Sequence, residues 1–119
     1  MKKPACFLDS RKIVPGSCFI CLPGAEKFVE DAKRRGASAV FYMDRFELGE
    51  WSCRYYENPS ASLKVIGVTG TNGKTTVVHF VSEALKRLQK QVLSLGTLSH
   101  RLTTLESIEN QALMADFLQ

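Results

Sequence analysis

The sequence lacks long apolar runs, and no stretch of its 119 residues approaches the roughly 18 apolar residues of a membrane-spanning helix. A secretory leader is also not expected, because Asp9 follows the N-terminal lysines before any apolar segment of sufficient length. The formal net charge of +4 is too small and too scattered to indicate a nucleic-acid partner. These absences predict a cytoplasmic protein with no membrane and no nucleic-acid partner.

Residues that bind metals are also scarce, since the chain has two histidines and four cysteines. Cys18 and Cys21 form a C-x-x-C pair, a spacing found in zinc and redox sites. They lie in the apolar run 17–22, and neither a second such pair nor a histidine pair accompanies them. The pattern favours reduced, mostly buried thiols, and we expect no metal or redox site there.

The first half of the chain alternates apolar runs with one helical pattern. Residues 17–22 and 37–42 predict buried strands, and residues 25–35, followed by Gly36, predict an amphipathic helix. Residues 53–56 could form a further short strand. Residues 57–62 are rich in turn formers and predict a linker.

The second half begins with a β-rich segment at 63–68 that predicts a strand. Apolar spacing predicts a helix over about 75–90, and residues 92–95 predict a second strand parallel to the first. Thr103 and Glu106 have the spacing of a capping box, which predicts a final helix from that point through Leu118.

The glycine-rich segment 69–76, Thr-Gly-Thr-Asn-Gly-Lys-Thr-Thr, lies between a predicted strand and a predicted helix. Glycines allow consecutive backbone N–H groups to face phosphate oxygens, and a helix N-terminus adds partial positive charge. Lys74 could reach the β- and γ-phosphates, and the Thr75 hydroxyl could ligate Mg²⁺. Val68 replaces the first glycine of the usual phosphate-loop pattern, so a glycine-rich turn that binds nothing remains an alternative.

This loop carries a family resemblance, because residues 65–76 closely resemble the ATP loop of the Mur ligases and their folylpolyglutamate synthase relatives. Further segments, in the family's order, resemble the muramoyl-tripeptide synthetases, or MurE type. They are Leu8-Asp9-Ser10-Arg11, residues 14–20, residues 36–40, Asn58-Pro59-Ser60, Gly96-Thr97 and Leu102-Thr103-Thr104.

The resemblance implies an α/β fold of two parts. Residues 1–60 would form a small N-terminal substrate domain that binds uridine, and residues 61–119 the first β-P-loop-α-β unit of a truncated P-loop ATPase domain. The implied activity is ATP-dependent amide-bond formation in peptidoglycan precursor synthesis. The enzyme would add meso-diaminopimelate or L-lysine to UDP-MurNAc-L-Ala-D-Glu through an acyl phosphate, using ATP and Mg²⁺.

The resemblance also implies roles for single residues. Leu8 and Ser10 would bind the uridine end of the substrate, and Thr103 and Thr104 the muramoyl-peptide. The ATP contacts would come from Gly70, Thr71, Asn72, Gly73, Lys74, Thr75 and Thr76, with Lys74 catalytic and Thr75 on Mg²⁺. As alternatives, residues 9–11 could form a surface turn, and Thr103 could act only as a helix cap.

The sequence departs from the family in several places. The segment after Gly24 is shorter than in the family, and Leu105 stands where a proline is common. The sequence stops before the family's acidic metal-binding segment, modified lysine and C-terminal domain. We therefore expect an N-terminal part of a ligase, inactive alone, whose partner is the remainder of the enzyme. The alternatives are a non-catalytic nucleotide-binding remnant, or another Mur or folylpolyglutamate-type ligase.

Overall fold

The computed structural model describes residues 3–96 and 105–119. The chain divides into two compact units, and the first ends at Asn58 and the second begins at Pro59. The elements of the first unit are β1 (Cys6–Phe7), η1 (Ser10–Lys12), β2 (Cys18–Cys21), η2 (Glu26–Phe28), α1 (Val29–Arg34), β3 (Ala39–Tyr42) and α2 (Arg45–Tyr55). Those of the second unit are η3 (Pro59–Ser62), α3 (Lys74–Arg87) and α4 (Ser107–Phe117). None of the helices described here is long and apolar enough to cross a membrane.

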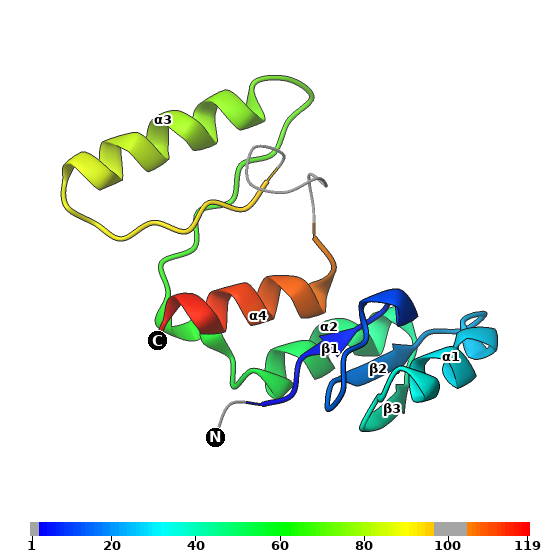
Figure 1. Ribbon diagram of the computed structural model, residues 1–119. Coiled ribbons are helices and arrows are strands. Elements are labelled where there is room, and N and C mark those ends of the chain that lie inside the picture. The colour runs from blue at the N-terminus through cyan, green and yellow to red at the C-terminus, as the bar shows by residue number, and fades with distance from the viewer. Residues whose placement is uncertain (1–2, 97–104) are drawn as a thin grey trace. The chain divides into compact units, whose positions relative to one another are not determined.

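The first unit is built on a parallel three-stranded sheet in the order β1-β2-β3 (Figure 1). Cys18 of the central strand lies opposite both Cys6 and Ala39. All four residues of β2 are buried, as expected for a strand covered on both faces of a parallel sheet. The strands predicted at 17–22 and 37–42 are thus confirmed, each shorter than predicted.

Helices cover both faces of this sheet. On one face Phe19 is fully buried in a core cluster with Val29 and Ala32 of α1. Because side chains alternate along a strand, Phe41 of β3 points to the other face, where its ring lies 5.0 Å from that of Trp51 of α2. The helix predicted at 25–35 is observed as the short η2 followed by α1.

The prediction of a strand at 53–56 is wrong, because residues 53–55 form the last turn of α2. The helix begins with a capping box, in which the Asp44 carboxylate accepts from the N–H groups of Phe46 and Glu47, both at 2.8 Å. Trp51 and Tyr55, four residues apart, stack with their ring centroids 4.7 Å apart. Aromatic residues that suit a strand are therefore used here on one face of a helix.

The second unit differs from its prediction in the segments that flank α3. Residues 63–68 and 91–96 form no hydrogen-bonded strand with any described residue, so the predicted β-P-loop-α-β unit is not observed. A strand needs a neighbour that satisfies its backbone N–H and C=O groups. Val65 and Ile66 are 67% and 62% exposed, which shows that β-propensity alone has not created a sheet at this point.

The helices of this unit are closer to expectation. The helix predicted at about 75–90 is confirmed as α3, which ends at Arg87, and Gln89 then takes a left-handed conformation (φ 57°). The final helix begins later than predicted, because Leu105 and Glu106 are not helical and Glu106 is the N-cap of α4. Thr103, the predicted cap, lies outside the described residues.

Candidate functional site

The glycine-rich loop leads directly into α3 in the second unit. Gly70 and Gly73 have φ values of 143° and 79°, in the region that favours glycine. Gly73 is the N-cap residue of α3, so the helix begins at Lys74 with no side chain on its cap. Because Gly73 has no Cβ, a ligand can approach the backbone at the N-terminus of α3 closely.

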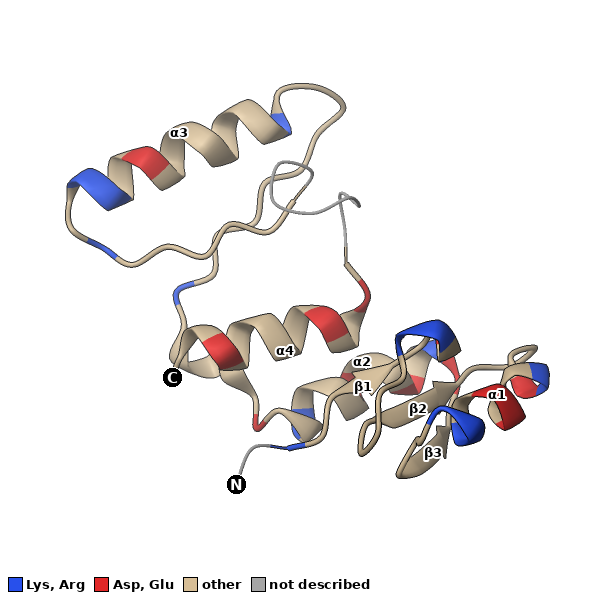
Figure 2. Cartoon of the chain, in the orientation of Figure 1, with Lys and Arg blue, Asp and Glu red and all other residues tan. Residues whose placement is uncertain are grey.

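The first turn of α3 leaves backbone donors available. The N–H of Val77 donates to the Gly73 carbonyl at 2.9 Å, which is the first hydrogen bond of the helix. The N–H groups of Lys74, Thr75 and Thr76 precede it and have no acceptor within the helix. No described side chain caps this terminus, and Figure 2 shows no acidic residue on the loop or first turn. This end of α3 suits an anion.

Lys74 lies over the same loop. Its Nζ donates to the Gly70 carbonyl at 2.6 Å, and the residue is partly buried. Thr75 and Thr76 are exposed, as are Thr71 and Asn72. The residues predicted to bind ATP therefore gather around one helix terminus, with an ammonium group, two hydroxyls and free N–H groups close together.

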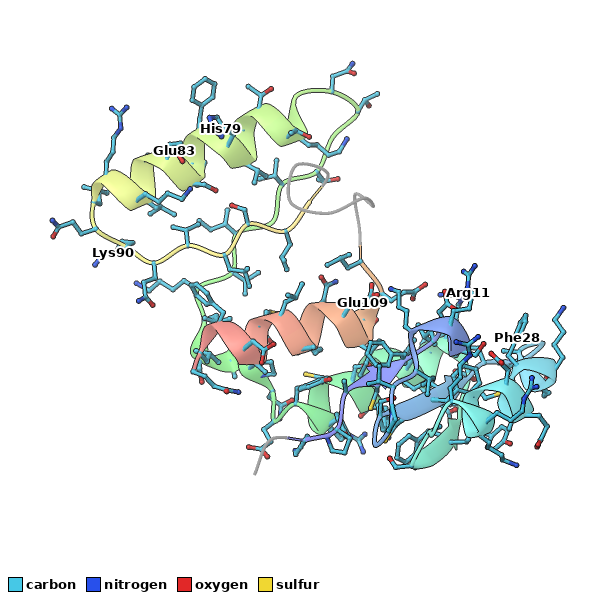
Figure 3. All side chains as sticks on the ribbon, in the orientation of Figure 1. Arg11, Phe28, His79, Glu83, Lys90 and Glu109 are labelled. Carbon is cyan, nitrogen blue, oxygen red and sulfur yellow. The ribbon has the colours of Figure 1, made fainter. Side chains whose placement is uncertain are left out.

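The first unit holds the Leu8-Asp9-Ser10-Arg11 segment, which leads into η1 with Asp9 as the N-cap residue. The Asp9 carboxylate accepts a hydrogen bond from the backbone N–H of Arg11 at 2.9 Å. The Arg11 guanidinium donates to both oxygens of the same carboxylate. This hydrogen bonding holds the pKa of Asp9 at about 2. Arg11 itself extends from the ribbon into solvent (Figure 3). Residues 9–11 thus form a turn with an internal ion pair.

Ser10 and Leu8 are less exposed than Arg11 of the same segment. Leu8 is partly buried and Ser10 is buried, with 5% of its surface exposed. The Ser10 hydroxyl donates to Asp31 Oδ2 of α1 at 2.9 Å. Sequence reasoning missed Asp31, because no local pattern connects a helical acid with a serine in an earlier turn. Thr103, Thr104 and Thr97 lie outside the described residues.

All four cysteines lie in the first unit and are free thiols. Cys6, Cys18 and Cys21 are buried in the sheet, and Cys53 is partly buried. Burial raises the pKa of the Cys6 thiol to about 12 and also raises that of Cys21. Among residues 3–96 and 105–119, no three His, Cys, Asp or Glu side chains are grouped so that they could hold a metal ion.

Comparison with known proteins finds relatives whose similarity extends over both halves of the chain. Residues 68–119 match the family described as the Mur ligase middle domain. The UDP-N-acetylmuramoyl-L-alanyl-D-glutamate–2,6-diaminopimelate ligase of Pseudomonas putida is 35% identical over an alignment that covers 92% of this chain and 28% of that ligase. Ligases of the same name from Coxiella burnetii and Clostridium botulinum are 35% and 34% identical, covering 77% and 92% of this chain. The chain spans 24% to 29% of the length of these three relatives.

Proposed function

The chain belongs to the Mur ligase family, and we propose that it carries two sites of an ATP-dependent peptidoglycan-precursor ligase. A nucleotide-sugar site would lie in residues 1–60, and an ATP site in residues 61–119. The reaction would join the D-Glu carboxylate of UDP-MurNAc-L-Ala-D-Glu to the amine of a diamino acid. The names of the relatives support 2,6-diaminopimelate over L-lysine as that diamino acid.

The observation that carries this proposal is the placement of Lys74 and Thr75 at the start of α3. A phosphate chain at this end would accept hydrogen bonds from the first-turn N–H groups and meet the positive end of the helix. Lys74 Nζ now binds the Gly70 carbonyl, so the ammonium group would exchange that carbonyl for a phosphate oxygen. Acidic side chains, which would repel a phosphate, are absent from the described residues of the loop and first turn.

Each residue of the loop then has a definite task. The backbone of 70–73 and the N–H groups of the first turn would hold the phosphates, and the Thr75 hydroxyl would ligate Mg²⁺. Lys74 would stabilise the charge that develops on the transferring phosphoryl group. Bound Mg·ATP would transfer its γ-phosphoryl group to the D-Glu carboxylate, giving an acyl phosphate and ADP. The amine would then attack the acyl carbon, which forms the amide bond and releases phosphate.

The substrate contacts complete the proposal. Leu8 and Ser10 would bind the uridine end of the nucleotide-sugar, with the neighbouring Arg11 ion pair keeping the η1 turn in shape. Thr103 and Thr104 are proposed for the muramoyl-peptide from the resemblance alone. Binding of the uridine end and of ATP would then be separable, because Leu8 and Ser10 lie in the first unit and the glycine-rich loop lies in the second.

Calorimetric titration of the chain with Mg·ATP and with UDP-MurNAc-L-Ala-D-Glu tests this proposal. We expect saturable binding of each ligand with a stoichiometry of one. A chain that binds neither ligand would lack both sites, and the proposal would be wrong. A chain that binds only Mg·ATP would keep the ATP site and lose the nucleotide-sugar site.

A further inference from the structure

Asp31 of α1 connects two elements of the first unit that are separate in sequence. Its Oδ2 accepts from the Ser10 hydroxyl and from Arg35 Nε, each at 2.9 Å. Its Oδ1 faces the Arg34 guanidinium at 3.4 Å. The bond to Ser10 links α1 to the η1 turn, whereas the two arginines belong to the same helical segment as Asp31 or directly follow it.

The bond to Ser10 is the strongest structural constraint among these contacts. Arg34 and Arg35 are exposed, and such i,i+3 and i,i+4 ion pairs contribute little in water. Ser10 is buried and its bond is to a charged acceptor, so water does not compete freely for it. The pKa of Asp31 is lowered chiefly by the hydrogen bond from Ser10 and secondly by the one from Arg35, so the carboxylate is ionised at neutral pH.

The direction of this bond limits what Ser10 can offer to a ligand. A serine hydroxyl has one proton and two lone pairs, and an ionised carboxylate can only accept. Ser10 therefore gives its single proton to Asp31 and retains only accepting capacity. Diphosphate oxygens are acceptors as well, so they do not match this hydroxyl. The matching groups at the uridine end are the imide N–H and the ribose hydroxyls.

We propose that Asp31 is a positioning residue of the nucleotide-sugar site. It orients the Ser10 hydroxyl to accept a hydrogen bond from an N–H or O–H group of the uridine end, and it anchors the η1 turn on α1. This inference rests on the proposed function, which places the nucleotide-sugar at Leu8 and Ser10.

The test is a set of calorimetric titrations of the full chain with UDP-MurNAc-L-Ala-D-Glu. Asp31→Ala is expected to weaken binding roughly tenfold, the effect of losing a charge-assisted hydrogen bond. Asp31→Asn is expected to stay within about threefold of the parent, because one amide oxygen can take the place of Oδ2 and accept from Ser10. Arg35→Gln is the matched control, and it removes the other donor to Oδ2 without changing affinity.

A double-mutant comparison separates positioning through Ser10 from a general loss of structure. In a Ser10→Ala background, Asp31→Ala is expected to change affinity by no more than about twofold, because the group through which it acts is already gone. Affinity for Mg·ATP serves as an internal readout that should be unchanged in every variant. If Asp31→Ala does not fold, Asp31→Glu takes its place. It keeps the charge but displaces it by one methylene, and it should weaken binding several-fold.

Three outcomes would overturn the inference. Asp31→Ala, or Asp31→Glu where it is needed, could bind the nucleotide-sugar like the parent. Alternatively, Asp31→Ala could weaken binding of the nucleotide-sugar by the same factor in the parent and in the Ser10→Ala background, which would mean that Asp31 acts independently of Ser10. Either result leaves the nucleotide-sugar site itself standing. A parent chain that binds Mg·ATP but not UDP-MurNAc-L-Ala-D-Glu would instead overturn the site and the role of Asp31 together.

Discussion

Lys74 Nζ donates a hydrogen bond to the carbonyl oxygen of Gly70, 2.6 Å away, across the glycine-rich loop that precedes α3. The bond holds the ammonium group on the loop that leads into the first helical turn, whose N–H groups are also donors. Both kinds of donor suit the oxygens of a phosphate chain. The loop therefore holds its charged group close to where the ligand is proposed to bind.

The first prediction concerns this lysine. Lys74→Ala is expected to reduce affinity for Mg·ATP roughly tenfold or more, because a charge-assisted contact to phosphate is lost. Calorimetry with Mg·ATP measures the change. Lys86→Ala, which removes a cation paired with Glu83 near the other end of α3, is the control and should bind like the parent. Equal affinity of Lys74→Ala and the parent would contradict the ATP site.

The second prediction concerns the backbone at the start of α3. Gly73 has a φ of 79° and open space around its Cα, so an added Cβ meets no neighbour but must adopt a left-handed conformation. Gly73→Ala is expected to destabilise the second unit by about 1 kcal/mol. Urea unfolding followed by far-ultraviolet circular dichroism measures the loss.

A matched glycine controls for the substitution itself. Gly67 also has open space but no positive φ, so Gly67→Ala should leave stability nearly unchanged. Equal stability of Gly73→Ala and Gly67→Ala would show that the left-handed conformation at residue 73 is not maintained in solution.

The third prediction concerns the thiols. Cys53 is the one partly exposed cysteine among the four, and the other three are buried. Because burial also raises the pKa of Cys6 to about 12, little thiolate forms there at mildly alkaline pH. Iodoacetamide is expected to label Cys53 first, as read by peptide mass spectrometry, and Cys6 only after denaturation. Early labelling of Cys6 in the native chain would contradict the buried sheet.

The fourth prediction concerns the start of α2. Asp44→Ala removes the acceptor for two backbone N–H groups and is expected to cost about 1 kcal/mol of stability. Trp51, the single tryptophan of the chain, lies in α2 and reports unfolding of the first unit by fluorescence. Glu30→Ala, which removes only an exposed ion pair with Lys33, should change stability far less. An unchanged midpoint for Asp44→Ala would show that the cap does not stabilise α2.

Much of the local structure could be predicted from short segments. The run at 17–22 is apolar throughout and became the buried central strand β2, and the apolar period at 75–90 became α3. The glycine-rich loop and Lys74 lie together in the sequence, so the candidate phosphate site could be read without any long-range information. Whether these residues bind ATP stays a prediction.

The failures have a common cause, which is that strands depend on partners. Residues 63–68 and 92–95 have strand propensity, yet no described neighbour pairs with them. Conversely, the two-residue strand β1 gave no sequence signal and exists because β2 offers its edge. At 53–56, aromatic residues suggested a strand, but stacking of Trp51 on Tyr55 and the cap at Asp44 favour a helix.

The sequence by itself determined the elements whose stabilising groups are close along the chain, such as α3, the glycine loop and the Asp9–Arg11 turn. Their hydrogen bonds close over a few residues and require no distant contact. Only the tertiary structure decided that the Ser10 hydroxyl meets Asp31, because α1 must first pack against the sheet beside η1. That contact spans 21 residues and depends on the burial of the whole first unit, which no local pattern encodes.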